Sequence, residues 1–118
     1  MTQVGIDLLE IGRLERALER HPRLARRLFT AAELEQSAGR ARPARHLAAR
    51  FCAKEAASKA LELSVFRPLD FEVVSGPSGE PDLALSGKAA ERARDLGVSL
   101  SCSLTHERSL AGAAVVAS

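Results

Sequence analysis

The segment that most constrains the fold is residues 50–61, RFCAKEAASKAL, whose alanine content strongly favours a helix. At about 100° per residue, Glu55 and Lys59 lie one turn apart on one face, and Arg50 and Lys54 form a second polar stripe. Most other positions are small or apolar, so this helix can pack closely on more than one side. Buried charges need partners. The simplest interpretation is nevertheless an ion pair between Glu55 and Lys59, worth a few tenths of a kcal/mol.

Apolar spacing and capping signals predict four helices in all. They cover about residues 10–20, 30–39, 43–63 and 88–96. The second begins with a capping box from Thr30 to Glu33 and fades near Gly39. Pro43 opens the third helix, where its missing N–H costs nothing, and Ser86 can cap the fourth.

The apolar period changes from 3.6 to 2 after residue 67, which predicts strands. Gly5, in a short strand near the N-terminus, permits a neighbouring backbone to approach closely. The expected strands are 4–8, 69–73, 82–85, 98–104 and 111–117, with a hairpin turn at 105–109. We therefore expect residues 1–118 to form one compact α+β domain, in which a small antiparallel-containing sheet packs against a long central helix.

Composition excludes several classes of protein. The net charge is +2, with 17 basic and 15 acidic residues, which is too balanced for a general polyanion binder. Trp and Tyr are absent, so stacking platforms for nucleic acid are few. No apolar run approaches the ~18 residues of a membrane span, and no secretion signal is evident. We expect a cytoplasmic protein, in which Cys52 and Cys102 are buried free thiols.

Ten arginines lie between residues 13 and 50, several of them clustered. Arg13, Arg16 and Arg20 recur on one side of the helix predicted over residues 10–20, and Arg23 follows soon after. A charged helix face is often only a solvated surface. The alternative is an electropositive surface that attracts an acidic helical partner.

Two carboxylates are candidates for a metal site. Asp7 falls near the end of the first strand and Glu55 lies on the long helix, so sequence spacing alone does not show whether they meet. If they do, two carboxylates together with phosphate oxygens would make a characteristic Mg²⁺ site, with Lys59 beside the same phosphate. Asp7 could instead only stabilise the start of the next helix.

The histidines are weaker candidates. Thr105 and His106 lie at the predicted hairpin turn, where His106 could donate to a phosphate or simply be exposed. His21 and His46 have no supporting context, and we expect both to be solvated.

Four motifs together resemble holo-[acyl-carrier-protein] synthase, the small trimeric class of the 4'-phosphopantetheinyl transferase superfamily. They are VGIDLLEI at 4–11, LFT with EL at 28–34, RFCAKEA with KAL at 50–61, and SCSLTH at 101–106. Their order and spacing hold over nearly the whole chain. The resemblance implies the fold of that superfamily and Mg²⁺-dependent transfer of 4'-phosphopantetheine from coenzyme A to a serine of an acyl carrier protein, releasing adenosine 3',5'-bisphosphate.

The resemblance also implies roles for particular residues. Asp7 and Glu55 would bind Mg²⁺, and Lys59 would hold the phosphate and complete a catalytic set with them. Arg50, Thr105 and His106 would bind coenzyme A together with Lys59. Family members are commonly homotrimers with active sites between subunits, and the arginines from Arg13 to Arg23 match the region that grips the carrier protein. The serine proton could pass to a metal-activated water or to a carboxylate, with Glu55 as the first candidate. Whether the carrier serves fatty-acid or polyketide synthesis stays open.

One departure from the family pattern follows the long helix. The family usually carries a glycine-rich turn after Lys-Ala-Leu, whereas this chain continues with ELSVF at 62–66. Glu62 would also repel a phosphate-rich ligand. This difference motivates an alternative, a non-catalytic relative that binds acyl carrier proteins and has an impaired coenzyme A site.

Overall fold

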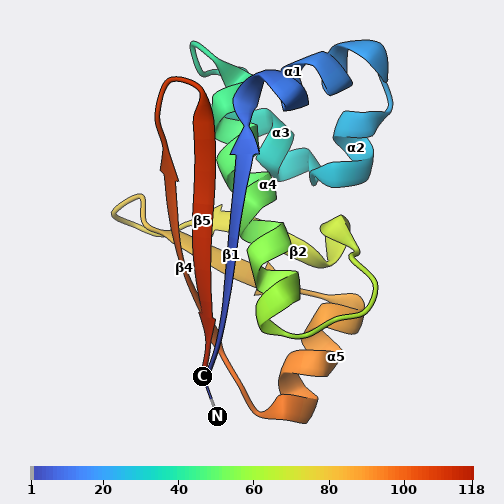
Figure 1. The fold of residues 1–118 in the computed structure, drawn as a ribbon, viewed down its shortest axis with the longest axis vertical. Helices are drawn as coiled ribbons and strands as arrows, with labels where there is room; N and C mark the ends of the chain where they lie inside the picture. Colours follow the sequence, from blue (N-terminus) through green and yellow to red (C-terminus); the bar gives the residue numbers. More distant parts are fainter. Residues whose placement is uncertain (1) are drawn as a thin grey trace.

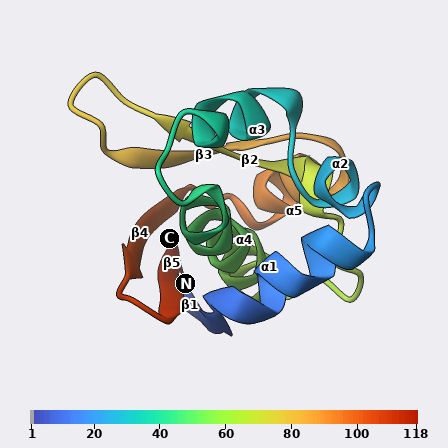
Figure 2. The ribbon, with the colours of Figure 1, turned by 90° about the horizontal axis from the view of Figure 1, so that it is seen from above.

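A computed structural model describes residues 2–118, and its central element is the helix α4 (Pro43–Ala60). This helix lies between two antiparallel sheets, as the view from above shows (Figure 2). The larger sheet has the order β1-β5-β4, formed by β1 (Gln3–Glu10), β5 (Leu110–Ala117) and β4 (Leu100–His106). The smaller sheet pairs β2 (Phe71–Ser75) with β3 (Pro81–Leu85). The predicted α+β fold, with a small antiparallel sheet on a long central helix, is confirmed.

Small side chains allow α4 to contact both sheets. Its inward alanines and Cys52 are almost fully buried, and β1, β5, β4 and β2 all pack on it. The closest approach is at Gly5 of β1, where a Cβ atom would overlap the carbonyl oxygen of Ala56. The expected close backbone approach at Gly5 is therefore confirmed, and it brings the middle of β1 directly against the second half of α4.

Within residues 2–118, four further helices surround this core (Figure 1). They are α1 (Ile11–Arg20), α2 (Leu24–Leu28), α3 (Ala31–Ala38) and α5 (Gly87–Leu96). Helix α1 continues β1 without a loop and buries Ile11 and Leu14. Helix α3 opens with the predicted capping box, in which Thr30 and Glu33 exchange side-chain and backbone hydrogen bonds. None of the helices in residues 2–118 combines the length and the apolar character needed to cross a bilayer.

Several element boundaries differ from the sequence prediction. Helix α2 was not expected, because a helix of five residues is too short to show apolar periodicity. Helix α4 ends at Ala60 rather than near residue 63. Pro68 begins a single 3-10 turn (Pro68–Asp70), which delays the start of β2 to Phe71.

Two predicted turn and capping signals also change. Ser86 occupies the N-cap position of α5, but its side chain makes no capping bond. Asp70 supplies the cap instead, because its Oδ2 accepts from the Lys88 N–H at 3.1 Å. Strand β4 extends through His106, so Thr105 and His106 belong to the strand, and the hairpin turn lies at residues 107–109.

The stripe of Arg50 and Lys54 is buried rather than exposed. Lys54 Nζ lies 2.6 Å from Glu33 Oε1, and it also donates to the carbonyl oxygens of Leu28 and Pro68. The other oxygen of Glu33 accepts from the Val73 N–H at 2.9 Å. Burial lowers the pKa of Lys54. This ion pair therefore joins α3, α4 and β2 in the interior of the molecule, away from Glu55 and Lys59.

Candidate functional site

Asp7, Glu55 and Lys59 come together where β1 crosses α4. Lys59 Nζ lies 3.4 Å from Asp7 Oδ1 and donates to the carbonyl oxygen of Ile6 at 3.0 Å. Partial burial and the negative charge of Asp7 raise the pKa of Glu55. Within residues 2–118 the ion pair of Lys59 is made with Asp7, and none was found with Glu55. The sequence could not show that the two carboxylates meet, and the structure places them within electrostatic reach of each other.

Cys52 forms the buried floor of this group, one turn before Glu55. Burial raises the pKa of the Cys52 thiol to about 12, with the charge of Asp7 as the second cause. The thiol donates to the carbonyl oxygen of Ala111 at 3.6 Å. It therefore stays protonated at neutral pH. Cys52 and Cys102 are both free thiols, the first buried and the second half-buried.

The two carboxylates are an incomplete donor set for a metal ion. No cluster of three or more His, Cys, Asp or Glu side chains able to enclose a metal occurs in residues 2–118. Mg²⁺ is usually held by one or two carboxylates together with substrate phosphates and water. Burial and then the charge of Asp7 raise the pKa of Glu55, and a cation between the two carboxylates would offset that second effect. Asp7 and Glu55 therefore fit a Mg²⁺ ion that is shared with a phosphate ligand.

A second group of candidates lies on the opposite side of α4. A cavity there, called the basic cavity below, is lined by four basic side chains together with polar and apolar residues. They are Arg40, His46, Arg50 and His106, with Gln36, Ala49, Ser75, Gly79, Pro81 and Leu104. The lining contains no carboxylate. Arg50 is only 8% exposed, which is unusual for an arginine without a carboxylate partner. The cavity therefore suits an anion such as a phosphate.

His46 does not conform to the sequence expectation. It was expected to be solvated, and the structure shows it half-buried between α3 and α4, with Nδ1 3.2 Å from Ser37 Oγ. Burial and then the charges of Arg50, Arg40 and His106 lower its pKa to about 4. The prediction failed because the residue that covers His46 comes from another helix. His21 is exposed, as expected.

Thr105 and His106 point to opposite faces of the large sheet, because consecutive strand residues alternate. His106 is registered with Ala111, on the face that packs against α4, whereas Thr105 is registered with Gly112 on the outer face. There Thr105 lines a hollow together with Asp7, Ile6 and Leu8. One chain therefore places Arg50 and His106 in the basic cavity and Thr105 on the other face of the sheet.

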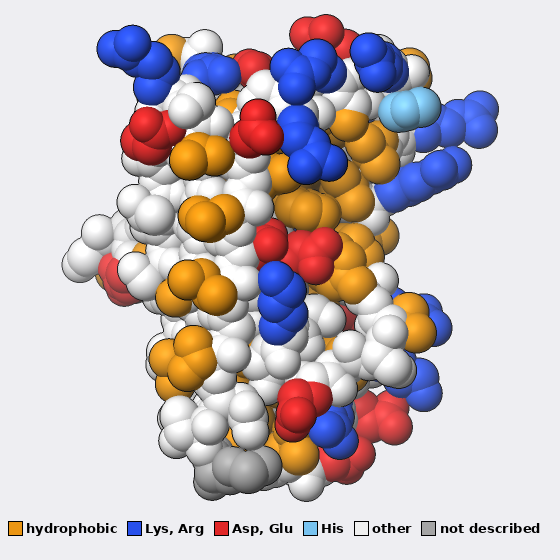
Figure 3. Space-filling view, in the orientation of Figure 1, with side chains coloured by type: hydrophobic (Ala, Val, Ile, Leu, Met, Phe, Trp, Pro, Cys, Tyr) orange, Lys and Arg blue, Asp and Glu red, His pale blue; other side chains and the backbone are white. Residues whose placement is uncertain are grey.

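The outer face of the large sheet is apolar and uncovered. Val4, Ile6 and Leu8 on β1 are each at least 64% exposed, and Val116 on β5 continues the row. Figure 3 shows hydrophobic side chains as a row of separate patches on this side of the molecule, next to a group of acidic and basic side chains. Such rows on soluble proteins mark contact surfaces.

The arginines of the first helix form a separate surface. Arg13, Arg16 and Arg20 are exposed on α1, and Arg23 precedes α2. Basic side chains gather over this end of the molecule, at the top of Figure 3. A hollow at the corner between α1 and α2 is lined by Arg20, Arg23 and Arg27 with apolar neighbours. The surface combines positive charge with apolar contact area.

The turn after α4 forms without glycine. Glu62 adopts the left-handed conformation, with φ of 54°, and Leu63 N–H donates to the Ser58 carbonyl oxygen to close the helix. A glycine would adopt this conformation without steric cost. The missing glycines therefore do not remove the turn, although they leave an acidic side chain on it.

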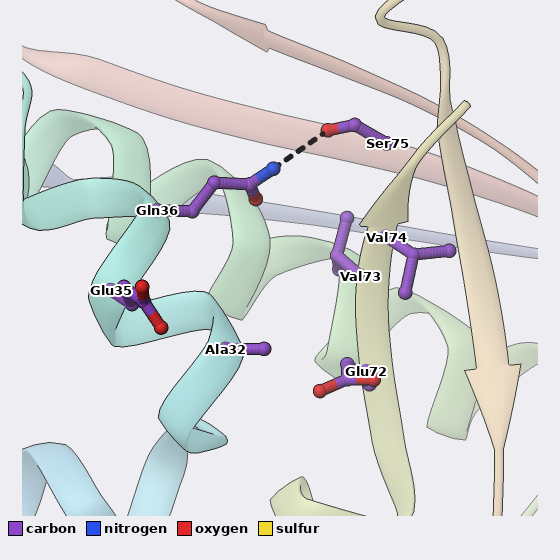
Figure 4. A pocket seen from close by; sticks show the side chains of 7 residues that line it. All are labelled: Ala32, Glu35, Gln36, Glu72, Val73, Val74 and Ser75. Carbon is purple, nitrogen blue, oxygen red and sulfur yellow. Dashed lines mark hydrogen bonds between the residues drawn. The ribbon is translucent and has the colours of Figure 1, made fainter. Parts of the chain in front are cut away.

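A third hollow lies between α3 and β2 and is not suited to a phosphate, because its ionisable side chains are Glu35 and Glu72 (Figure 4). Gln36 and Ser75 line both this hollow and the basic cavity. Their hydrogen bond, 3.3 Å from Gln36 Nε2 to Ser75 Oγ, forms part of the wall between the two.

Comparison with known proteins shows the family to which this fold belongs. Residues 3–114 match the family described as ACPS: 4'-phosphopantetheinyl transferase superfamily. The holo-[acyl-carrier-protein] synthase of Moorella thermoacetica is 45% identical over 116 residues, covering 96% of this chain and 91% of that protein. The Helicobacter pylori holo-[acyl-carrier-protein] synthase in complex with coenzyme A superposes with a TM-score of 0.84, at 29% identity over 98% of this chain and 99% of that one. The Chronobacterium ammoniagenes ACPS-CoA complex gives 0.88, at 25% identity over 99% and 96%.

Proposed function

We propose that this chain, which belongs to the 4'-phosphopantetheinyl transferase superfamily, transfers the 4'-phosphopantetheine group of coenzyme A to a serine hydroxyl of an apo acyl carrier protein and releases adenosine 3',5'-bisphosphate. The observation that carries this proposal is the meeting of Asp7, Glu55 and Lys59 at the contact of β1 and α4. A carboxylate pair with an adjacent ammonium is the equipment that pyrophosphate cleavage requires, since phosphoryl-type transfer depends on charge neutralisation and positioning. The names of the similar proteins support the same substrates.

Asp7 and Glu55 would hold a Mg²⁺ ion in this proposal. Their side chains are partly buried and close enough for the charge of one to raise the pKa of the other. When bound, the ion would neutralise oxygens of the coenzyme A pyrophosphate. The Cys52 thiol beneath them is not a competing ligand, because Mg²⁺ prefers oxygen ligands.

Lys59 and Glu55 supply the remaining chemistry from the chain itself. Lys59 Nζ is fixed by Asp7 and by the Ile6 carbonyl oxygen, and its side chain is 54% exposed, so it can contact a phosphate that approaches from solvent. There it would neutralise the charge that develops on the leaving bisphosphate. The serine hydroxyl must lose a proton, and Glu55 is our candidate acceptor.

Coenzyme A would bind between subunits of a homotrimer. Arg50 and His106 line the basic cavity, whereas Asp7 and Glu55 lie on the other side of α4. A ligand that contacts both groups therefore needs a second copy of the chain. The uncovered apolar row of Val4, Ile6 and Leu8 offers the surface for such a contact, and Thr105 lies beside it.

The carrier protein would dock on the basic surface of α1 and α2. Arg13, Arg16, Arg20 and Arg23 present positive charge there, which would attract an acidic helix and speed its association. We also place the enzyme in the cytoplasm, where free thiols such as Cys52 and Cys102 persist.

The test is incubation of the protein with coenzyme A, Mg²⁺ and apo acyl carrier proteins from fatty-acid and polyketide synthesis, followed by mass spectrometry of the carrier. We expect a mass gain equal to one phosphopantetheine group, which is lost when Mg²⁺ is chelated. The Glu55→Gln protein should give no gain while unfolding at a similar temperature, and Glu35→Gln, a change in the hollow between α3 and β2, should behave as wild type. Tight carrier binding without any mass gain would instead support the non-catalytic alternative.

A further inference from the structure

The basic cavity contains an imidazole, that of His46, which neither the motifs nor the proposed chemistry use. We propose that His46 is a further residue of the coenzyme A site and takes up a proton at Nε2 when a phosphate of coenzyme A enters the cavity. This inference rests on the proposed function, because it takes coenzyme A as the source of the phosphate.

The hydrogen bonds around His46 fix its neutral form. Its Nδ1 lies 3.2 Å from Ser37 Oγ, and Ser37 Oγ donates its single hydrogen to the Glu33 carbonyl oxygen at 2.8 Å. Ser37 must therefore accept from Nδ1–H, which leaves Nε2 with a lone pair. Nε2 is buried and has no hydrogen-bond partner within residues 2–118, and the same is true of Arg50 Nε, one turn further along α4.

Burial is the largest cause of the low pKa of His46, and the charges that face it add to that effect. Arg50 on α4, Arg40 in the loop between α3 and α4, and His106 on β4 all act on it, and every one of them disfavours a positive imidazole. Glu33 of α3 acts on Arg50, but it is also engaged by Lys54 and by two backbone N–H groups. Among the described residues that line the cavity, the positive groups therefore have no carboxylate beside them.

A phosphate in this cavity would act against the part of this effect that comes from the positive charges. Its negative charge would offset Arg40 and Arg50 and favour the imidazolium form, in which both nitrogens of His46 carry a hydrogen. A proton from solvent would then bind to Nε2, and Nδ1–H would keep its bond to Ser37. The bound state would hold one proton more than the separate components, provided that the phosphate stays a dianion.

The proton change at His46 is opposite in direction to the proton change at the phosphate itself. Binding of a phosphate to arginines favours its dianion and releases protons, because its second pKa is about 6. Protonation of His46 has the opposite effect, a net uptake of protons. Between the pKa values of free and bound His46, affinity should rise by up to about tenfold for each unit by which the pH falls.

Isothermal titration of coenzyme A at pH 7, in two buffers of different ionisation enthalpy, measures this uptake directly. We expect proton uptake by the wild-type protein and a dissociation constant that falls between pH 8 and pH 6.5. In His46→Gln the amide offers a donor that does not titrate, so binding should persist with no uptake and with little pH dependence. His46→Phe removes the donor and should weaken binding at least tenfold at pH 6.5.

Circular dichroism of each variant shows whether it is folded. Equal proton uptake by wild type and His46→Gln would overturn the inference while the proposed function stands. Absence of coenzyme A binding in all three folded proteins would instead overturn the proposed function.

Discussion

Lys54 and Glu33 form an ion pair that is closed to solvent at both ends, with 2.6 Å between Nζ and Oε1 and no exposure of either side chain. Lys59, five residues further along the same helix, has a side chain that is 54% exposed and pairs with Asp7 over 3.4 Å. Two lysines of one sequence motif therefore have different roles. Lys54 holds the interior together, and Lys59 faces the candidate site.

Replacement of each lysine by methionine should separate these roles. Lys54→Met should lower the free energy of unfolding by about 3–5 kcal/mol, because it leaves the buried charge of Glu33 without a partner. Lys59→Met should cost less than about 1 kcal/mol, since its ion pair is largely exposed. Transfer should fall at least about a hundredfold in Lys59→Met, and persist in Lys54→Met at a temperature where it is folded. Urea denaturation and the carrier mass assay measure the two effects.

A second change checks the origin of the loss. Adding Glu33→Gln to Lys54→Met removes the unpaired charge while keeping an amide oxygen for the backbone N–H groups, so part of the lost stability should return. A double variant less stable than Lys54→Met would show that packing, rather than the uncompensated carboxylate, sets the cost.

Gly5→Ala should destabilise the protein by about 1–3 kcal/mol and reduce transfer, because the new methyl group would overlap the Ala56 carbonyl oxygen and push β1 away from α4. The matched control is Gly39→Ala, since Gly39 has φ of −83° and no heavy atom near the position of a Cβ. Thermal unfolding compares the two. Equal melting temperatures would mean that β1 and α4 do not need this close contact.

Glu62→Gly should stabilise the protein by about 1 kcal/mol. Glu62 has φ of 54°, a conformation that costs an L residue about 1–2 kcal/mol and costs glycine little, although glycine loses part of this gain to entropy in the unfolded chain. Glu62→Ala removes the same carboxylate but keeps the Cβ, so it should not stabilise. If alanine stabilises as much as glycine, the gain comes from charge rather than from the backbone.

The stability of the unliganded protein should depend on the pH through His46. Its pKa is about 4 in the folded protein, against an ordinary value of 6.5. Between these values the unfolded chain binds more protons, so this residue makes stability fall as the pH falls from 6.5 towards 4. His46→Gln should flatten that part of the curve, measured by urea denaturation at several pH values. His21→Gln, at an exposed position, should leave the curve unchanged.

Reversal of charge on α1 should weaken the binding of the carrier protein. Arg13→Glu with Arg20→Glu changes four units of charge on the proposed docking surface, so affinity at low salt should fall at least tenfold, and less at high salt. Lys88→Glu with Arg94→Glu makes the same change on α5 as the control. Equal losses in the two pairs would point to net charge rather than to a surface on α1.

The sequence predicted most of what local interactions determine. The capping box at Thr30, the helix opened by Pro43 and the close approach at Gly5 all follow from short-range geometry, and all are present. The register of the sheet places Thr105 and His106 on opposite faces, which their adjacency in the sequence could have indicated.

Features that depend on distant parts of the chain were missed. The cover of Ser37 over His46 and the pairing of Lys54 with Glu33 both join α4 to α3, and no spacing along the chain reveals them. The same is true of Asp7 and Glu55, whose meeting depends on where β1 lies against the helix. The resemblance to a family supplied that relationship as an expectation, and composition did not.

The placement of Arg50 and Glu55 on different sides of α4 has a consequence for regulation by concentration. In the proposed assembly no single folded chain holds a complete site. Dilution that separates the subunits would therefore abolish activity while each subunit stays folded. Two chains that are each inactive, one defective at Glu55 and the other at Arg50, could restore each other in a mixed assembly. The rate of transfer would then depend on the number of subunit contacts rather than on the number of chains.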